Sequence, residues 1–447
     1  MPQSDLLPHH VSPYDRLCWS DVEVERLLAS GEQRRELESY FGVREYRELA
    51  ALAHGARRKS IRASAPRVFI VPGIMGSQLG LTRRAPLPHD IVWIDPVDIS
   101  AGRLSVLRPA PDDGIVSLGV VLYTYLRLKL YLRAAGFDPV FFDYDWRLGV
   151  DVLGRALAER LRQERARRIM LVAHSMGGLV ARAALAQAGT ERVRRVVLLG
   201  TPNFGSFAAV QALRGTYAVV RKLARLHQRC SAEWLAANVF NDFPSLYHLL
   251  PAPGHSARLD LFDSAAWPQS GPRPRRALLA AARAFTAALP AADERFVVIA
   301  GINQETVTAV ARRGDEFVYT ITRNGDGTVP TEQALLPGTL AYFTGASHSD
   351  LTRDPAVAQA VADLLRHGKT QQLPTLRGRA GRAEARISDR QLRLTQVDKV
   401  DWSALTPSAR RDFLQSLNEP PELTLRAPAR SRPVLRAPSR SARRRTR

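Results

Sequence analysis

AHSMGG, at residues 173–178, joins a short apolar run to an Ala-rich stretch, and this junction decides the fold. The run IMLV at 169–172 is typical of a buried strand, and residues 179–188 have the pattern of a helix. A serine on so sharp a turn presents its hydroxyl above the sheet, and the positions two before and two after it tolerate only small side chains. Gly177 meets this demand, while Ala173 replaces the first glycine of the pattern G-x-S-x-G. Because small residues also surround a serine for packing alone, Ser175 needs catalytic partners to be read as a nucleophile.

The first partner that a serine nucleophile needs is a base, which a carboxylate must orient. Asp326 lies between two glycines in NGDGTVP at 324–330, directly after the strand-like run 317–322. Gly-Asp-Gly is also a common tight turn, so Asp326 by itself is a weak signal. Its place on a loop at the end of a strand is nevertheless the place that the acid of a catalytic triad requires.

His348 is the candidate base. It lies in GASHSD at 345–350, between the strand-like run 340–343 and a helical pattern at 355–365. The order serine, acid, histidine is that of α/β-hydrolases, and each of the three follows a strand. This agreement predicts a triad of Ser175, Asp326 and His348.

Four other histidines lie in the elbow or between the serine and the acid. Successive residues of a strand point to opposite faces, so we expect His174 to stay away from the Ser175 hydroxyl. His227, His248 and His255 lie in the stretch between the serine and the acid, and they remain reserve bases.

A Gly-rich turn, PGIMGS at 72–77, follows the strand pattern at 68–71. An oxyanion hole needs two amide donors, and we assign them to Met176, next to the serine, and to Ile74 in this turn, with Met75 as the alternative. The turn is also compatible with a plain loop or part of a phosphate cradle. No G-K-[ST] follows it, which argues against a nucleotide-binding P-loop.

These motifs together resemble the lecithin:cholesterol acyltransferase group, which includes the phospholipid:diacylglycerol acyltransferases and the lysosomal phospholipase/transacylase. The resemblance spans about residues 66–366, and no single motif would suffice for it. The matching pieces are VPGIMGS at 71–77, YDWR at 144–147, AHSMGG at 173–178, GTPNFGS at 200–206, PSLY at 244–247, GDGTV at 325–329 and His348.

The resemblance implies an α/β-hydrolase fold, with a mostly parallel sheet flanked by helices and a helical cap. It also implies acyl transfer from a lipid ester through an acyl-serine, released to water, as in a lipase, phospholipase or esterase, or to an alcohol, as in an O-acyltransferase. Such a cycle needs no cofactor, and no H-E-x-x-H or paired-Cys motif indicates a metal. The alternative is a catalytically silent lipid- or membrane-binding module on the same fold.

The sheet pattern stops after Ser206, and helix-like spacing continues to about residue 292. We expect this insertion to be the cap that shapes the substrate pocket. Met75 and four cap residues would suit the wall of an acyl-binding pocket. The cap residues are Trp234, Phe240, Phe243 and Leu246. For each cap residue, a place in the cap's own small core is at least as good an interpretation.

The 447 residues divide into four predicted parts. Residues 1–60 form an N-terminal helical extension, with helices at 21–28 and 36–52, and 61–368 form the catalytic domain with its cap at about 206–292. A C-terminal extension with a short helix follows at 369–422. Cys18 and Cys230 give no disulfide framework, and neither a signal peptide nor 18 uninterrupted apolar residues occur, so we expect a cytoplasmic protein that works at the periphery of a membrane.

The fourth part, residues 423–447, is an Arg-rich tail. From Arg366 onward, 20 Lys and Arg stand against 7 Asp and Glu, so +13 of the net +21 lies there, and the tail itself has nine arginines and no acid. Such a segment cannot bury a core and is expected to be disordered. It keeps the protein in solution or attracts anionic lipid, at about 1 kcal/mol per basic residue near the surface. Nucleic acid is the less favoured partner because the predicted substrate lies in lipid, and the sequence leaves the oligomeric state open.

Removing residues 423–447 tests the role of the tail. If the tail binds membranes, the shortened protein sediments less with vesicles of anionic lipid than the full chain does. Vesicles of zwitterionic lipid serve as the control. Equal sedimentation of both proteins with anionic vesicles would exclude the membrane role.

Overall fold

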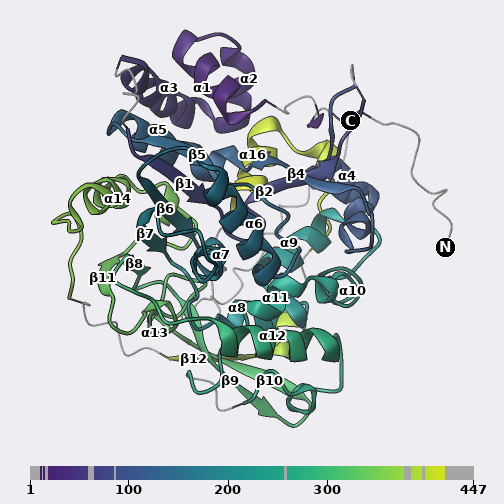
Figure 1. Ribbon diagram of the computed structural model, residues 1–447. Helices are drawn as coiled ribbons and strands as arrows, with labels where there is room; N and C mark the ends of the chain where they lie inside the picture. The colour runs from purple at the N-terminus through teal and green to yellow at the C-terminus, as the bar shows by residue number, and fades with distance from the viewer. Residues whose placement is uncertain are drawn as a thin grey trace, which may run out of the picture.

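A parallel β-sheet lies at the centre of the molecule (Figure 1). The computed structural model describes residues 11–12, 14–15, 19–58, 65–84, 87–255, 259–376, 384–394 and 398–417. The predicted tail at 423–447 lies outside these residues, as does Cys18. Within the described part of the chain, no helix is both long and apolar enough to cross a bilayer.

The central sheet has six strands in the order β11-β8-β7-β6-β1-β5, and every neighbouring pair is parallel. The strands are β1 (Arg67–Val71), β5 (Asp138–Phe141), β6 (Ile169–His174), β7 (Val193–Leu199), β8 (Phe296–Gly301) and β11 (Leu340–Thr344). This order confirms the predicted strands at 68–71, 169–172 and 340–343. It also brings the ends of β1 and β6 together, because these strands are direct neighbours.

Helices cover both faces of this sheet. Phe69 and Leu171 face one core with α6 (Val150–Gln163) and α7 (Met176–Leu185), whereas Ile70 and Val172 face the other. The second core contains α5 (Leu122–Ala134) and α14 (Pro355–His367). Burial on both faces explains why the strands are apolar without alternation, as in other parallel sheets. The predicted helix at 355–365 is confirmed, and the one predicted at 179–188 begins three residues earlier and ends at Leu185.

Two small antiparallel sheets were not predicted. One has the order β3-β2-β4, with β2 (Ser77–Leu81), β3 (Asp90–Trp93) and β4 (Ile115–Val120), and it follows directly on the Gly-rich turn. The other has the order β12-β10-β9, with β9 (Thr306–Arg313), β10 (Glu316–Thr322) and β12 (Ala385–Ser388). The strand predicted at 317–322 therefore exists, but it belongs to this outer sheet. The acid turn consequently follows an inserted hairpin rather than a strand of the central sheet.

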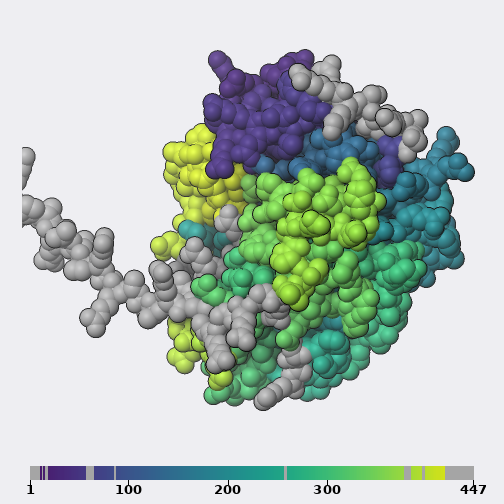
Figure 2. Space-filling model, turned by 90° about the vertical axis from the view of Figure 1, so that its left-hand side faces the viewer, coloured from purple at the N-terminus to yellow at the C-terminus, as the bar shows by residue number. Residues whose placement is uncertain are grey.

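The N-terminal helices pack on α5 at one end of the molecule (Figures 1 and 2). They are α1 (Asp21–Ser30), α2 (Arg34–Phe41) and α3 (Val43–Arg58). The single helix predicted at 36–52 is split at Gly42, whose φ of 87° a side chain would rarely adopt. Their apolar side chains share a core with Leu126 and Leu130 of α5.

The cap and the C-terminal extension lie against each other. The cap contains α8 (Phe207–Leu213), α9 (Ala218–Leu226), α10 (Ala232–Asn238), η4 (Phe240–Asp242), α11 (Pro244–His248) and α12 (Arg276–Ala288). The extension contains β12, α15 (Asp389–Leu394), η7 (Trp402–Ala404) and α16 (Pro407–Ser416). One fully buried ion pair joins them, because Arg214, after α8, donates to Asp389 at 2.9 Å and both side chains are 0% exposed. Tyr319 of β10 donates to the same carboxylate at 2.7 Å.

Asp389→Asn tests how much this ion pair contributes to the stability of the fold. The substitution leaves the Arg214 guanidinium buried without its counter-charge, so we expect the free energy of unfolding to fall by about 3–5 kcal/mol in chemical denaturation. The matched control is Glu384→Gln, which breaks the exposed pair with Arg386 and should cost less than about 1 kcal/mol. Equal losses in the two variants would contradict a structural role for the buried pair.

Candidate active site

Ser175 sits at a strained turn between β6 and α7. Its backbone has φ 53° and ψ −128°, a conformation that a residue with a side chain rarely adopts. A Cβ on Gly177 would lie 2.3 Å from the Pro72 carbonyl oxygen, so the turn is possible only because this position has no side chain. Ala173 is fully buried in β6 between β1 and β7, and its methyl group is accommodated there.

The structure brings the three predicted triad residues together. The Nε2 atom of His348 lies 2.9 Å from the Ser175 Oγ, and its Nδ1 lies 2.7 Å from Oδ2 of Asp326. A carboxylate only accepts hydrogen bonds, so Nδ1 carries the hydrogen and Nε2 accepts from the serine hydroxyl. All three side chains are buried. This is the hydrogen-bond order that a serine nucleophile needs.

Backbone contacts fix the carboxylate of Asp326. Its Oδ1 accepts from the amides of Thr328 at 2.9 Å and Val329 at 2.7 Å, which leaves Oδ2 for the histidine. The amide of His348 also donates to the Asp326 carbonyl at 2.8 Å. Acid and base are therefore tied by backbone as well as by side chains.

Two glycines make room for this pair: Gly200, the first residue of the GTPNFGS motif, and Gly301, which was not predicted. A Cβ on Gly200, after β7, would lie 2.9 Å from Oδ2 of Asp326 and 3.1 Å from Nδ1 of His348. A Cβ on Gly301, at the end of β8, would lie 2.4 Å from the Asp326 Cβ. For Gly301, only its position at the end of a strand next to β7 could have indicated it, since the carboxyl ends of parallel strands meet at one edge of the sheet.

The Gly-rich turn at 72–77 lies against the serine. A Cβ on Gly73 would lie 2.8 Å from the Ser175 Cβ, and Ile74 and Met75 line the cavity above the hydroxyl. Met176 is the first residue of α7, so its amide has no partner within the helix. The turn and the helix start thus flank Ser175 on two sides, as an oxyanion hole requires.

Aromatic side chains clamp this turn. The Tyr144 hydroxyl donates to the Pro72 carbonyl at 2.5 Å, and the indole N–H of Trp146 donates to the Ser77 carbonyl at 3.0 Å. Trp93 donates to the Met75 carbonyl, also at 3.0 Å. Two residues of the YDWR motif therefore hold the turn in place.

His174 forms a hydrogen-bonded link that the sequence reasoning did not predict. Its Nε2 lies 2.9 Å from the His348 carbonyl oxygen, and its Nδ1 lies 3.0 Å from the Tyr125 hydroxyl. That hydroxyl accepts from the Gly73 amide at 2.8 Å. Because burial, and next the nearby His348, lower the pKa of His174 to about 3, the ring is neutral and donates only through Nε2. One neutral histidine thus joins the backbone of the base to the turn beside the serine.

The reserve histidines lie elsewhere. His248 accepts from the Val150 amide at 3.0 Å and stacks on Phe285, while His227 accepts from the amides of Arg229 and Cys230. His255 stacks on Phe204. None of these contacts involves the Ser175 hydroxyl, which contacts His348 instead.

A cavity of about 100 Å³ lies above the serine hydroxyl. Met75 and Leu246 line it, as predicted for an acyl-binding wall, together with Ala209, Tyr217 and Leu417. Within the part of the chain that is described, no group of three His, Cys, Asp or Glu side chains is arranged to hold a metal ion.

The other three residues predicted for the wall are not in the lining. Phe240 and Phe243 are buried in the cap, where they pack edge to face with centroids 5.4 Å apart, and Phe243 also packs on Trp146. Trp234 is 41% exposed on α10. The prediction was wrong for these residues because apolar spacing identifies buried side chains without telling which cavity or core they enter.

Comparison with known proteins agrees with this architecture. The family model of the PGAP1-like alpha/beta domain matches residues 151–240, from α6 through the elbow into the cap. Residues 151–240 are thus similar to the PGAP1-like α/β domain. With the strand order of the central sheet, this match confirms the predicted α/β-hydrolase fold.

Individual relatives are distant. The uncharacterized protein YJR098C of Saccharomyces cerevisiae is 29% identical over 149 residues, which cover 29% of this chain and 23% of that protein. Among solved structures, the Bacillus licheniformis lipase BlEst2 in its propeptide form is 17% identical with a TM-score of 0.37, over 72% of this chain and 53% of that one. The Tle4-Tli4 complex gives 14% identity and a TM-score of 0.41, over 68% and 98%. The chain spans less than a quarter of the yeast relative and about half of the lipase propeptide form.

The low pKa of His174 predicts an acid-sensitive fold. In the unfolded chain the pKa of a histidine is about 6.5. Between that pH and about 3, the unfolded state therefore binds a proton that the native state does not bind. The free energy of unfolding should therefore fall with decreasing pH, by up to about 1.4 kcal/mol per unit from this residue.

Denaturation at pH 7 and pH 5 measures this effect. We expect His174→Gln to lose less stability between the two pH values than the wild type, although buried His248, whose pKa is lowered to about 4, still contributes. His54→Gln, at an exposed site on α3, is the control and should behave like the wild type. The same pH dependence in all three proteins would rule out a neutral His174.

Proposed function

We propose that this chain is a serine-dependent acyl hydrolase or O-acyltransferase of lipid esters. Ser175 is the nucleophile, His348 the general base and acid, and Asp326 the residue that orients the base. The observation that carries the proposal is the continuous hydrogen-bonded order of these three side chains, at 2.9 Å and 2.7 Å, on a strained strand-to-helix turn. Strain of this kind persists where the surrounding structure over-determines it, and it clusters at functional sites.

The first half of the proposed cycle acylates the serine. His348 takes the hydroxyl proton through Nε2 while the Ser175 Oγ attacks the ester carbonyl carbon. The amides of Ile74 and Met176 bind the oxygen that becomes negative, each worth about 2.7–4 kcal/mol where such donors have been removed. Collapse of the tetrahedral intermediate breaks the bond to the alcohol, which leaves with the proton from His348.

The second half releases the acyl group. Water or an acceptor alcohol gives its proton to His348 as its oxygen attacks the acyl-serine, and Ser175 recovers that proton when the new acid or ester departs. Asp326 stabilises the imidazolium in both halves. Every proton and bond is accounted for by the ester, the acceptor and the three side chains.

We also propose that the chain is a member of the lecithin:cholesterol and phospholipid:diacylglycerol acyltransferase group. The motif residues Tyr144 and Trp146 support this, because their hydrogen bonds hold the turn beside Ser175. A catalytically silent lipid-binding module is the alternative, and a complete serine, histidine and aspartate relay has no use in such a module. In this proposal the enzyme works in the cytoplasm at a membrane surface, with the Arg-rich segment 423–447 attracting anionic lipid.

Ester hydrolysis by single variants tests the mechanism. The substrates are p-nitrophenyl butyrate and palmitate, then phospholipids with and without a diacylglycerol or sterol acceptor. Ser175→Ala and His348→Ala should each lower kcat by about 10⁴-fold or more, and Asp326→Asn by about 10²–10⁴-fold. An acyl-acceptor ester among the products would identify transfer rather than hydrolysis.

Ser105→Ala, at an exposed serine far along the chain from the elbow, is the matched control and should keep full activity. Circular dichroism should show the same fold in every variant. Cleavage that survives in the Ser175→Ala variant would refute the nucleophile.

A further inference from the structure

The cavity above Ser175 is too small for a long acyl chain. Its volume is about 100 Å³, whereas sites for ordinary organic ligands measure about 300–1,000 Å³. One wall of it is Leu417, the residue that follows α16, and this side chain is only 1% exposed. A residue from the C-terminal extension thus occupies space beside the serine.

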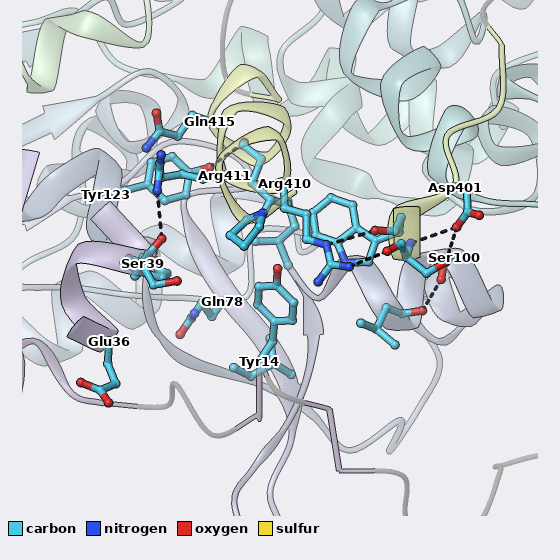
Figure 3. A pocket seen from close by; sticks show the side chains of 18 of the residues that line it. Tyr14, Glu36, Ser39, Gln78, Ser100, Tyr123, Asp401, Arg410, Arg411 and Gln415 are labelled. Atoms are coloured by element: carbon cyan, nitrogen blue, oxygen red, sulfur yellow. Dashed lines mark hydrogen bonds between the residues drawn. The ribbon is translucent and has the colours of Figure 1, made fainter. Parts of the chain in front are cut away.

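A much larger space lies on the other side of α16. This chamber measures about 1060 Å³, and residues of α2, β2, β3, α4 (Pro96–Ala101), α5, η7 and α16 line it (Figure 3). Its lining mixes polar and charged side chains with an apolar part that includes Tyr14, Ile91, Ile94, Val97, Trp402 and Leu414. Its volume is large enough for a long apolar ligand.

The chamber and the catalytic cavity border on the same three segments. Gly76 lines the cavity and Gln78 the chamber, at the start of β2. At the start of α5, Tyr125 lines the cavity and Tyr123 the chamber. At the end of α16, Leu417 lines the cavity and Leu414 lines the chamber. The last turn of α16 is therefore a partition between the two spaces.

The charged groups of α16 do not make the chamber a site for an anionic headgroup. Arg410 and Arg411 point from α16 toward η7 and α2 (Figure 3). Arg410 donates to the carbonyls of Trp402 at 3.1 Å and Ser403 at 3.0 Å, and Arg411 donates to the Ser39 carbonyl at 3.3 Å. Arg35 of α2 also lines the chamber, but so do the carboxylates of Glu36 and Asp401. These two acids disfavour a phosphate or carboxylate ligand relative to a hydrocarbon chain.

The partition is held differently at its two ends. Lys399 anchors the start of the segment on the cap, since its ammonium donates to three carbonyls near the end of α9, at 2.7, 2.7 and 2.8 Å. In contrast, α16 itself has no fully buried residue, although Phe413 and Leu414 pack on the core in part. Its backbone accepts from the Tyr123 hydroxyl at Leu414, at 3.3 Å, and from Lys222 at Ser416. Segments with little burial open at low free-energy cost. Residues 398–417 therefore form a strap that Lys399 anchors at its start and whose helix lies over the site with little burial.

We propose that the chamber receives the long acyl chain of the substrate, and that the strap, with Leu417 as its stop, closes the passage from Ser175 to it. The inference rests on the proposed function and adds a substrate class, long-chain acyl esters, and a gate. When α16 lifts, the cavity and the chamber become one site. With the strap closed, only a short acyl group fits beside the serine.

Chain-length selectivity tests the gate. Leu417→Ala opens the partition, so kcat/KM for p-nitrophenyl palmitate should rise at least ten-fold relative to that for the butyrate. Lys399→Ala loosens the anchor and should act in the same direction. Leu394→Ala and Lys369→Ala are the matched controls, because both residues are exposed and line neither space, and they should leave the ratio unchanged.

Filling the chamber tests its occupant. Val97→Trp should lower palmitate hydrolysis at least ten-fold and leave butyrate hydrolysis unchanged, which also shows that the variant folds. Val152→Trp, at an exposed site on α6, is its control. A fluorescent sixteen-carbon fatty acid should bind Ser175→Ala, and it should bind more weakly when Val97→Trp is added.

The two proposals fail in different ways. If the wild type cleaves neither ester, or if Ser175→Ala cleaves both, the proposed function is wrong. If Ser175-dependent cleavage is present but the ratio of palmitate to butyrate is the same in Leu417→Ala, Val97→Trp and the wild type, the chamber and gate are wrong and the catalytic site stands.

Discussion

The backbone turn at Ser175 is the constraint on which the rest of the site depends. A positive φ at a residue with a side chain costs about 1–3 kcal/mol, and the turn persists because its surroundings allow no other path. The Ser175 amide donates to the Leu199 carbonyl of β7 at 2.9 Å, and Gly73, Gly177 and Gly178 let the neighbouring segments approach closely. The hydroxyl is thus aimed by packing that lies outside the serine itself.

The base and the acid reach this turn along different routes. His348 follows β11 of the central sheet, whereas Asp326 follows a hairpin inserted after β8. The hairpin does not displace the acid, because the chain returns to its starting point, where the Gln304 amide donates to the Gly325 carbonyl at 3.0 Å. Thr306, the first residue of the hairpin, also accepts from the Gly327 amide at 2.8 Å. Because the two ends of the inserted hairpin are hydrogen-bonded to each other, the insertion does not disturb a site whose side chains must be positioned to within less than about 1 Å.

Sequence patterns predicted those features that depend on residues close together in the chain. The elbow, the Gly-rich turn and the strand before His348 are short apolar runs with turn residues at their ends, and the structure has all three. The membership of 316–322 in an outer sheet could not be predicted, because pairing with β9 and β12 depends on segments distant in the chain. The link through His174 likewise depends on Tyr125, which lies 49 residues earlier.

The aromatic side chains of the cap explain where the site can move. Phe243 packs between Phe240 and Trp146, and Trp146 also holds the turn beside the serine, so the cap and the catalytic centre share one rigid core. Interiors packed in this way transmit strain instead of yielding to it. In our proposal, a substrate longer than the catalytic cavity therefore finds its room where packing is weakest. Among the described elements around Ser175, that is α16, which buries none of its residues while the one after it, Leu417, reaches the cavity.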